Sequence, residues 1–255
     1  GSILYDVLYP LKKEGNTFDN FLTGKASFMY SPNKNKNVKN LDRIIDINNI
    51  YSQNRLGLDD SVEGGQSITL GGEYKIADKE NNSILTAGLA SVLRDKNEDK
   101  LPINSTINNK SSDFIGALNF KPNKNFTFDY NFSVDNDFSS ANYNLVKTDI
   151  TINKFVTSFE FLQEDDEIGR ENYYSNETTL QLNASNSLKY RTRRNKKTDF
   201  TEFYNLIYEY KNDCLTASIQ YNKDYYSDNE LKPTEEIFFS LSIVPLATLN
   251  TPSAR

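Results

Sequence analysis

Apolar and polar side chains alternate along most of this chain. Between Phe126 and Val134, every even position is apolar or aromatic and every odd position is polar. The same alternation runs from Gln66 to Ile76 and from Leu215 to Asn222. A period of two places successive side chains on opposite faces of a β-strand. The pattern therefore predicts an all-β chain whose strands have one apolar face and one polar face.

We expect about thirteen strands, several of them close to the roughly nine to eleven residues that a tilted strand needs to cross a membrane. They begin near Ile3, Leu22, Gln66, Ile84, Phe114, Phe126, Tyr143, Phe155, Thr178, Leu188, Glu202, Cys214 and Glu236. The last strand is expected at about 236–245, followed by a short tail at 246–255. The chain has no apolar run long enough for a membrane helix, whereas a membrane β-barrel needs apolar residues only at alternate positions.

The connections between these strands alternate in length. Short ones are expected at 78–83, 121–125, 153–154, 185–187 and 211–213, and long ones at 31–65, 95–113, 135–142, 163–177, 194–201 and 224–235. Successive connections of an up-and-down sheet lie at opposite ends, so short turns share one rim and long loops the other. Bacterial outer-membrane barrels have short periplasmic turns and long extracellular loops. The sequence therefore predicts an antiparallel up-and-down transmembrane β-barrel.

The strand count indicates part of a barrel. Bacterial single-chain barrels have an even number of strands, whereas the expected number here is odd and the first strand begins at Ile3. The chain also begins at Gly1 without an initiating Met or a signal segment. We therefore expect residues 1–255 to form the C-terminal part of the barrel. Further strands and a periplasmic domain are expected upstream.

Composition excludes several classes of function. The chain has no His, which removes the Ser-His-Asp triad, the Cys-His pair and His-bearing metal sites. Neither a GxGxxG nor a GxxxxGK[ST] motif is present. The net charge of −6 argues against a nucleic-acid partner, because neutralising phosphates requires clustered Lys and Arg. We therefore expect no catalytic residues, metal or cofactor.

Several motifs resemble one family. Residues 54–65 read Asn-Arg-Leu-Gly-Leu-Asp-Asp-Ser-Val-Glu-Gly-Gly, which is similar to the NR…D.VEGG signature of the lipopolysaccharide-assembly outer-membrane protein (LptD family). The turn Pro122-Asn123 resembles the mid-barrel hairpin of the same family. The stretch 208–214, Tyr-Glu-Tyr-Lys-Asn-Asp-Cys, resembles its tyrosine-rich strand and acidic turn, and 228–241 resembles its C-terminal end. The likeness runs from about Leu22 to Leu246.

The resemblance implies a function at the outer membrane of a Gram-negative cell. A protein of this family receives lipopolysaccharide from periplasmic bridge proteins through its N-terminal domain. It inserts the lipid into the outer leaflet through a lateral opening of the barrel, which is filled by a plug lipoprotein. The alternative is a general porin or other diffusion channel, which shares the alternation but not a cysteine at the periplasmic rim. An outer-membrane enzyme and a soluble β-sandwich adhesin are further alternatives.

The loop motif consists of Asn54, Arg55, Asp60, Glu63, Gly64 and Gly65. One interpretation is an extracellular loop that folds into the barrel mouth, with Arg55 paired to Asp60 or Glu63. The other is an ordinary loop end in which Gly64 and Gly65 supply positive φ before the next strand. We favour an ordered structural loop over a ligand site.

Cys214 is the single cysteine of the chain. The residues leave two interpretations open, a disulfide formed in the oxidising periplasm and a buried thiol that packs as a small apolar group. The resemblance favours a disulfide to a cysteine of the upstream periplasmic domain. Relatives often have two adjacent cysteines at this turn, whereas Leu215 follows Cys214 here, so at most one bridge is expected.

The last strand forms one side of the lateral gate if the resemblance holds. The gate residues are then Phe238, Phe239, Ser240, Leu241, Ser242 and Pro245. Pro245 has no N–H to donate to a ladder, so strand pairing must weaken there. The alternative is that Pro245 only ends the strand.

Overall fold

The computed structural model describes residues 1–41, 43–58, 62–165, 170–225, 234–243 and 247–250. In these ranges the chain consists of strands and one short 3-10 helix, η1 (Ile103–Ser105). The strands are β1 (Ile3–Lys13), β2 (Phe18–Ser31), β3 (Gly65–Asp78), β4 (Ser83–Arg94), β5 (Phe114–Asn123), β6 (Phe126–Val134), β7 (Ala141–Ile152), β8 (Phe155–Glu164), β9 (Asn172–Gln181), β10 (Asn186–Asn195), β11 (Phe200–Lys211), β12 (Leu215–Asp224), β13 (Thr234–Ile243) and β14 (Ala247–Asn250).

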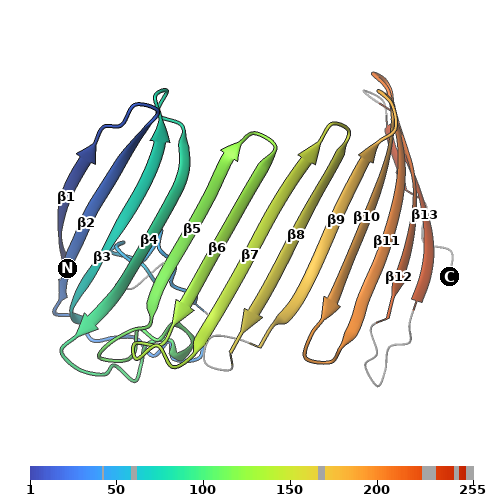
Figure 1. Ribbon diagram of the computed structural model, residues 1–255. Coiled ribbons are helices and arrows are strands. Elements are labelled where there is room, and N and C mark those ends of the chain that lie inside the picture. Colours follow the sequence, from blue (N-terminus) through green and yellow to red (C-terminus); the bar gives the residue numbers. More distant parts are fainter. Residues whose placement is uncertain (42, 59–61, 166–169, 226–233, 244–246, 251–255) are drawn as a thin grey trace. The chain divides into compact units, whose positions relative to one another are not determined.

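The strands follow one another in a single sheet in chain order, from β1 at one edge to β14 at the other. Successive strands pair antiparallel, in β1 to β6 and again in β9 to β14 (Figure 1). This confirms the predicted all-β, up-and-down architecture. The chain divides into a first unit (Gly1–Val146 with Leu162–Glu171) and a second unit (Lys147–Phe161 with Asn172–Arg255), and each is described by itself.

Turn lengths alternate as expected in the first unit. Short turns join β1 to β2, β3 to β4 and β5 to β6 at one end, and the long loops 32–64 and 95–113 lie at the other end (Figure 1). The long connection expected at 194–201 is wrong, because β10 and β11 continue their ladder to the pair Asn195 and Phe200. A bulge between Arg193 and Arg194 and a positive φ of 48° at Asp199 allow a tight turn there.

The C-terminal end also differs in detail from the expectation. β13 ends at Ile243, and the segment expected as a tail contains β14. Pro245, one of the expected gate residues, lies outside the described residues.

One face of the first unit exposes large apolar side chains. Phe28, Ile68 and Leu93 form a row across β2, β3 and β4 and are 41%, 43% and 44% exposed. The adjacent row on the other face, Ser27, Thr69 and Val92, is buried. A protein folded in water places its apolar face inward. An apolar face turned outward is typical of a strand wall in contact with lipid.

The second unit has the same two faces. Tyr208, Ile219 and Phe239 form an exposed row across β11, β12 and β13. On the opposite face the row Glu177, Arg191, Asn205, Asn222 and Glu236 crosses β9 to β13. The Arg191 guanidinium donates to Asn205 Oδ1 at 3.2 Å. The second unit therefore has a polar face suited to a lumen behind an apolar face suited to hydrocarbon.

Candidate functional site

The long loops of the first unit cover the polar face of its strands. Val38, Ile45, Ile50 and Leu56 from loop 32–64, together with Leu101 and Ile107 from loop 95–113, form a buried apolar cluster with Ala90, Val92 and Ile115 of the strands. The main apolar core thus lies between the loops and the polar face, on the side away from the exposed apolar rows. We call loops 32–64 and 95–113 together the cap.

Small side chains in the strands allow the cap to come close to the sheet. A Cβ atom at Gly71 would collide with the Tyr51 hydroxyl of loop 32–64 and with the Leu89 carbonyl oxygen. A Cβ atom at Gly88 would lie 2.9 Å from Ile47 Cγ1 of the same loop. Glycine at these positions therefore allows loop 32–64 to pack directly against the backbone of the sheet.

A buried ion pair fastens loop 32–64 to the sheet. The Arg55 guanidinium donates from Nε to Glu63 Oε2 at 2.8 Å and from Nη2 to Glu63 Oε1 at 2.5 Å. It also donates to Ser67 Oγ at 2.9 Å and to Thr69 Oγ1 at 3.2 Å, both on β3. The two-pronged geometry is the strong form of an arginine–carboxylate contact. The C-terminal part of the loop is therefore anchored to β3, the strand that follows it.

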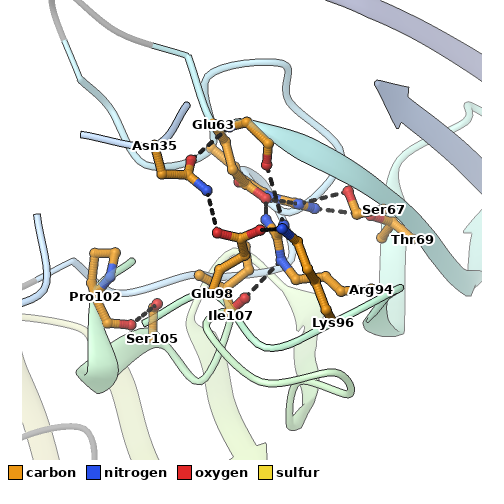
Figure 2. Close-up of polar contacts among 12 residues, drawn as sticks. Asn35, Glu63, Ser67, Thr69, Arg94, Lys96, Glu98, Pro102, Ser105 and Ile107 are labelled. Carbon is orange, nitrogen blue, oxygen red and sulfur yellow. Dashed lines mark hydrogen bonds and ion pairs between the residues drawn. The ribbon is translucent and has the colours of Figure 1, made fainter. Parts of the chain in front are cut away.

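Arg94, the last residue of β4, is a second cation on the same carboxylate. Its guanidinium forms an ion pair with Glu63 and is fully buried (Figure 2). Arg94 Nε donates to the Ile107 carbonyl at 2.8 Å, which joins loop 95–113 to the same point. We call Arg55, Glu63 and Arg94 the latch. Both loops of the cap depend on it.

A further set of contacts joins the two loops directly. The Asn35 side-chain amide donates to Glu98 Oε2 at 2.9 Å (Figure 2). The backbone N–H of Val38 donates to the Lys100 carbonyl at 2.8 Å. The Gly64 N–H donates to Asn35 Oδ1 at 2.6 Å. The cap is therefore one hydrogen-bonded layer in which each loop supports the other.

Burial affects the titration of two cap residues. It lowers the pKa of Arg55 to about 9, because the charged guanidinium loses its hydration. The side chain remains protonated at neutral pH, as pairing with Glu63 requires. Burial also raises the pKa of the Tyr51 phenol to about 12. Arg55 therefore keeps its charge over the ordinary range of pH, and the arrangement of the latch is suited to holding the loops in place.

The residues of the predicted loop motif have different roles in the structure. Arg55 pairs with Glu63, and Asp60 lies outside the described residues. Asn54 is exposed and closes a turn, since its side chain accepts from the Leu58 N–H at 3.0 Å and donates to the Leu58 carbonyl at 2.9 Å.

The two glycines of the motif also differ from each other. Only Gly65 has positive φ, at 88°. Gly64 is needed for another reason, because a Cβ there would collide with the Asn33 carbonyl oxygen. The alternative interpretation, in which both glycines supply positive φ, is therefore wrong for Gly64.

Sequence reasoning missed three residues that hold the cap together. Arg94 at the end of β4, Glu98 of loop 95–113 and Asn35 of loop 32–64 were not singled out. The sequence did indicate that Arg94 is buried. Arg94 follows Ala90 and Val92 at alternate positions, so it lies on the same buried face of β4. A charge at the end of that row needs an opposite charge close by. No comparable pattern marks Glu98, whose partner comes from a distant loop.

The remaining predicted site residues lie in the second unit. Cys214 is exposed in the turn between β11 and β12. In β13, Phe239 and Leu241 are in register with Ile219 and Ala217 on the apolar face. Phe238, Ser240 and Ser242 alternate with them and are in register with Gln220, Ser218 and Thr216.

A strand wall with one face for lipid and a capped polar face defines this chain as part of an outer-membrane β-barrel. In the described ranges, no helix is both long enough and apolar enough to cross a membrane. The family model of LptD, LPS transport system D, matches residues 3–169. The chain belongs to this family of outer-membrane proteins, which act in lipopolysaccharide transport and assembly. A comparison with curated proteins found no match.

Proposed function

We propose that this chain forms part of the wall of a translocon that inserts lipopolysaccharide into the outer leaflet through a lateral opening beside β13. The chain performs no catalysis in this role. The observation that carries the proposal is the unequal pairing of β13. Among the residues that the structure describes, β13 pairs with β12 over ten residues and with β14 over four.

Two strands that are joined by a short ladder are suited to separating. To let a lipid pass sideways, two strands must separate and lose the backbone hydrogen bonds between them. Fewer pairs mean a smaller cost, since each hydrogen bond contributes about 1 kcal/mol net. The seam between β13 and β14, paired from Ser240 to Ile243, is therefore the easier one to open.

The cap supports a sideways route over a lengthwise one. Loops 32–64 and 95–113 cover the polar face of the first unit at its long-loop end with a buried apolar cluster and a buried latch. A lipid with several acyl chains gains nothing from a polar route to water, whereas the exposed apolar rows lead directly into the hydrocarbon.

Family membership supports partners from the lipopolysaccharide-transport system. The partners proposed here are lipopolysaccharide as the substrate, a plug lipoprotein in the barrel, and periplasmic bridge proteins that dock on an N-terminal domain. The exposed position of Cys214 at the short-turn end supports a disulfide with a cysteine of that domain. The bridge would hold the domain beneath the barrel.

Locking the seam tests the opening. The paired positions Ser240 and Asn250 are replaced by Cys in the full-length protein, with Cys214 changed to Ser. Oxidation should block the delivery of lipopolysaccharide to the cell surface, and reduction should restore it. The matched control is S240C with S218C, which joins β13 to β12 through the same serine.

The two disulfide-locked variants have different expected effects on lipopolysaccharide export. Export should continue when β13 is bound to β12, since that ladder stays closed in the proposed mechanism. Normal export with the Ser240–Asn250 bridge fully formed would contradict a lateral opening at this seam.

A further inference from the structure

The apolar face of the second unit contains a groove of about 410 Å³. It is lined by Tyr208, Tyr210, Ala217, Ser218, Ile219, Phe239, Ser240 and Leu241. Two rows of the sheet enclose it, Tyr208–Ile219–Phe239 and Tyr210–Ala217–Leu241. The hollow arises at Ala217, the smallest side chain of the two rows, between larger side chains on both neighbouring strands.

One end of the groove has a polar boundary. The Tyr208 hydroxyl donates to Asn186 Oδ1 at 2.5 Å, and the Asn212 amide donates to the Tyr210 hydroxyl at 3.2 Å. Asn186 begins β10 and Asn212 lies in the turn between β11 and β12, both at the short-turn end. Tyrosines whose rings face hydrocarbon and whose hydroxyls have polar partners are typical of the membrane–water boundary. The groove therefore starts at the head-group level and runs towards the middle of the membrane.

We propose that this groove binds one acyl chain of a phospholipid, with the lipid head group at the short-turn rim. The groove walls are apolar, and its two phenol hydroxyls have partners in the protein. A polar ligand would lose its hydration there without compensation. A hydrocarbon chain loses nothing and gains close contact with aromatic and aliphatic side chains on both sides. The proposal of this site depends on the position of the sheet in the membrane and does not depend on lipopolysaccharide export.

The position of the groove along the strands indicates which class of lipid it binds. Short turns of such barrels face the periplasm, and Ala217 is two residues from Leu215, where β12 begins. At about 3.3 Å per residue, this places the groove within the leaflet on the periplasmic side. That leaflet consists of phospholipid, whereas lipopolysaccharide is delivered to the other one. The groove also flanks β13, so a bound chain would lie beside the proposed seam.

Photo-cross-linking in cells tests the proposal. The benzophenone amino acid p-benzoylphenylalanine replaces Phe239 in the full-length protein, and the adduct is identified by mass spectrometry. The matched control places the same group at Ile237, on the same strand and face but outside the groove. The two side chains are 53% and 45% exposed, so both face the membrane. We expect a phospholipid adduct at Phe239 well above that at Ile237.

Filling the groove provides a second readout. Ala217→Leu, combined with the probe at Phe239, should reduce the adduct to the level of the Ile237 control, whereas Ala217→Ser should leave it unchanged. Both variants are checked for folding by the heat-dependent shift of the barrel on a gel, and the comparison of Phe239 with Ile237 needs neither variant.

Three results would overturn the site. They are equal adducts at the two probe positions, an adduct that Ala217→Leu does not reduce, and an adduct of lipopolysaccharide or protein in place of phospholipid. Export of lipopolysaccharide is measured in the same cells. Loss of the adduct with normal export would separate this site from the proposed translocation function.

Discussion

At the scale of single residues, the latch concentrates three charges in a buried site. Glu63 is the only carboxylate among the three side chains, and both Arg55 and Arg94 depend on it. Removing one member of a buried ion pair leaves an uncompensated charge, which is far more costly than the loss of an exposed pair. The stability of the cap therefore depends most strongly on Glu63.

Glu63→Gln should lower the free energy of unfolding by about 3–5 kcal/mol, because two guanidinium groups then lie buried without a carboxylate. The change is measured by denaturant unfolding in detergent and by trypsin digestion of intact cells, in which loop 32–64 should become cleavable. Glu80→Gln, in the exposed turn between β3 and β4, is the matched control and should have no effect. A resistant loop in Glu63→Gln would show that the latch does not hold the cap.

The thiol of Cys214 gives a second prediction at this scale. In the full-length protein in native membranes, a maleimide reagent should label Cys214 only after reduction, because the thiol is expected to be in a disulfide. A cysteine introduced at Ala184, which is exposed in the turn between β9 and β10, reports whether the reagent reaches this rim. Labelling of both cysteines without a reductant would argue against the bridge.

Only part of the latch could be predicted from the sequence. Arg55 and Glu63 lie in one motif, and their opposite charges suggest a pair. Arg94 joins them because the ladder between β3 and β4 brings Ser67 opposite Arg94. Strand register depends on the pairing of whole strands, so a charge pattern within one segment does not reveal it.

At the scale of elements, β3 and β4 serve two environments at once. Their outward positions include the large apolar side chains of Ile68, Leu70 and Leu93, which are exposed, whereas their inward positions include Gly71 and Gly88, where loop 32–64 comes close. Glycine on the inner side and large apolar side chains on the outer side thus allow one strand to contact a loop and lipid together.

Gly71→Ala should disturb the cap, since the added methyl group would collide with the Tyr51 hydroxyl and the Leu89 carbonyl oxygen. Overpacking of this kind costs roughly 1–3 kcal/mol, measured as a loss of unfolding free energy and a gain in trypsin cleavage of loop 32–64. Gly72→Ala is the control, because its new Cβ meets only the Thr23 carbonyl oxygen, at 3.4 Å. Equal effects of the two substitutions would mean that the loop does not set the requirement for glycine.

The alternation of side chains predicted the strands well, and the turns less well. Periodicity identified β6 and β12 closely because each strand contacts a different environment on each face. The turn between β10 and β11 was expected to be long, and the segment from Arg194 to Asp199 is polar throughout. Polar residues also suit a strand whose inner face is wet, so polarity alone does not mark a strand end in a barrel.

At the scale of the whole molecule, the distribution of apolar side chains between the two faces decides where the protein can fold. Large exposed side chains such as Leu70 and Ile219 would be a liability in water and are suited to lipid. The expectation of an outward apolar face followed from the sequence. Which face of the sheet points away from the rest of the protein could be decided only from the cap, because the cap shows which face the protein itself covers.

Ile219→Lys should prevent or weaken insertion, because a charge on the lipid face costs roughly 2–4 kcal/mol near the middle of the membrane. Gln220→Lys places the same charge one residue further along β12, on the polar face, and should be tolerated. Both are measured as the fraction of heat-modifiable protein in the outer membrane. Equal insertion of the two variants would contradict the assignment of the faces.

The position of the latch has a consequence for the order of assembly. Arg55 and Glu63 belong to one loop, and Arg94 reaches them as soon as the β3–β4 hairpin finds its register. Contacts this close along the chain form early, so the cap can be built before distant strands are joined. Pulse-labelled hydrogen exchange during refolding should show protection at 55–94 ahead of β9 to β13. A barrel segment that inserts with its cap already folded does not expose an open pore through the outer membrane during assembly.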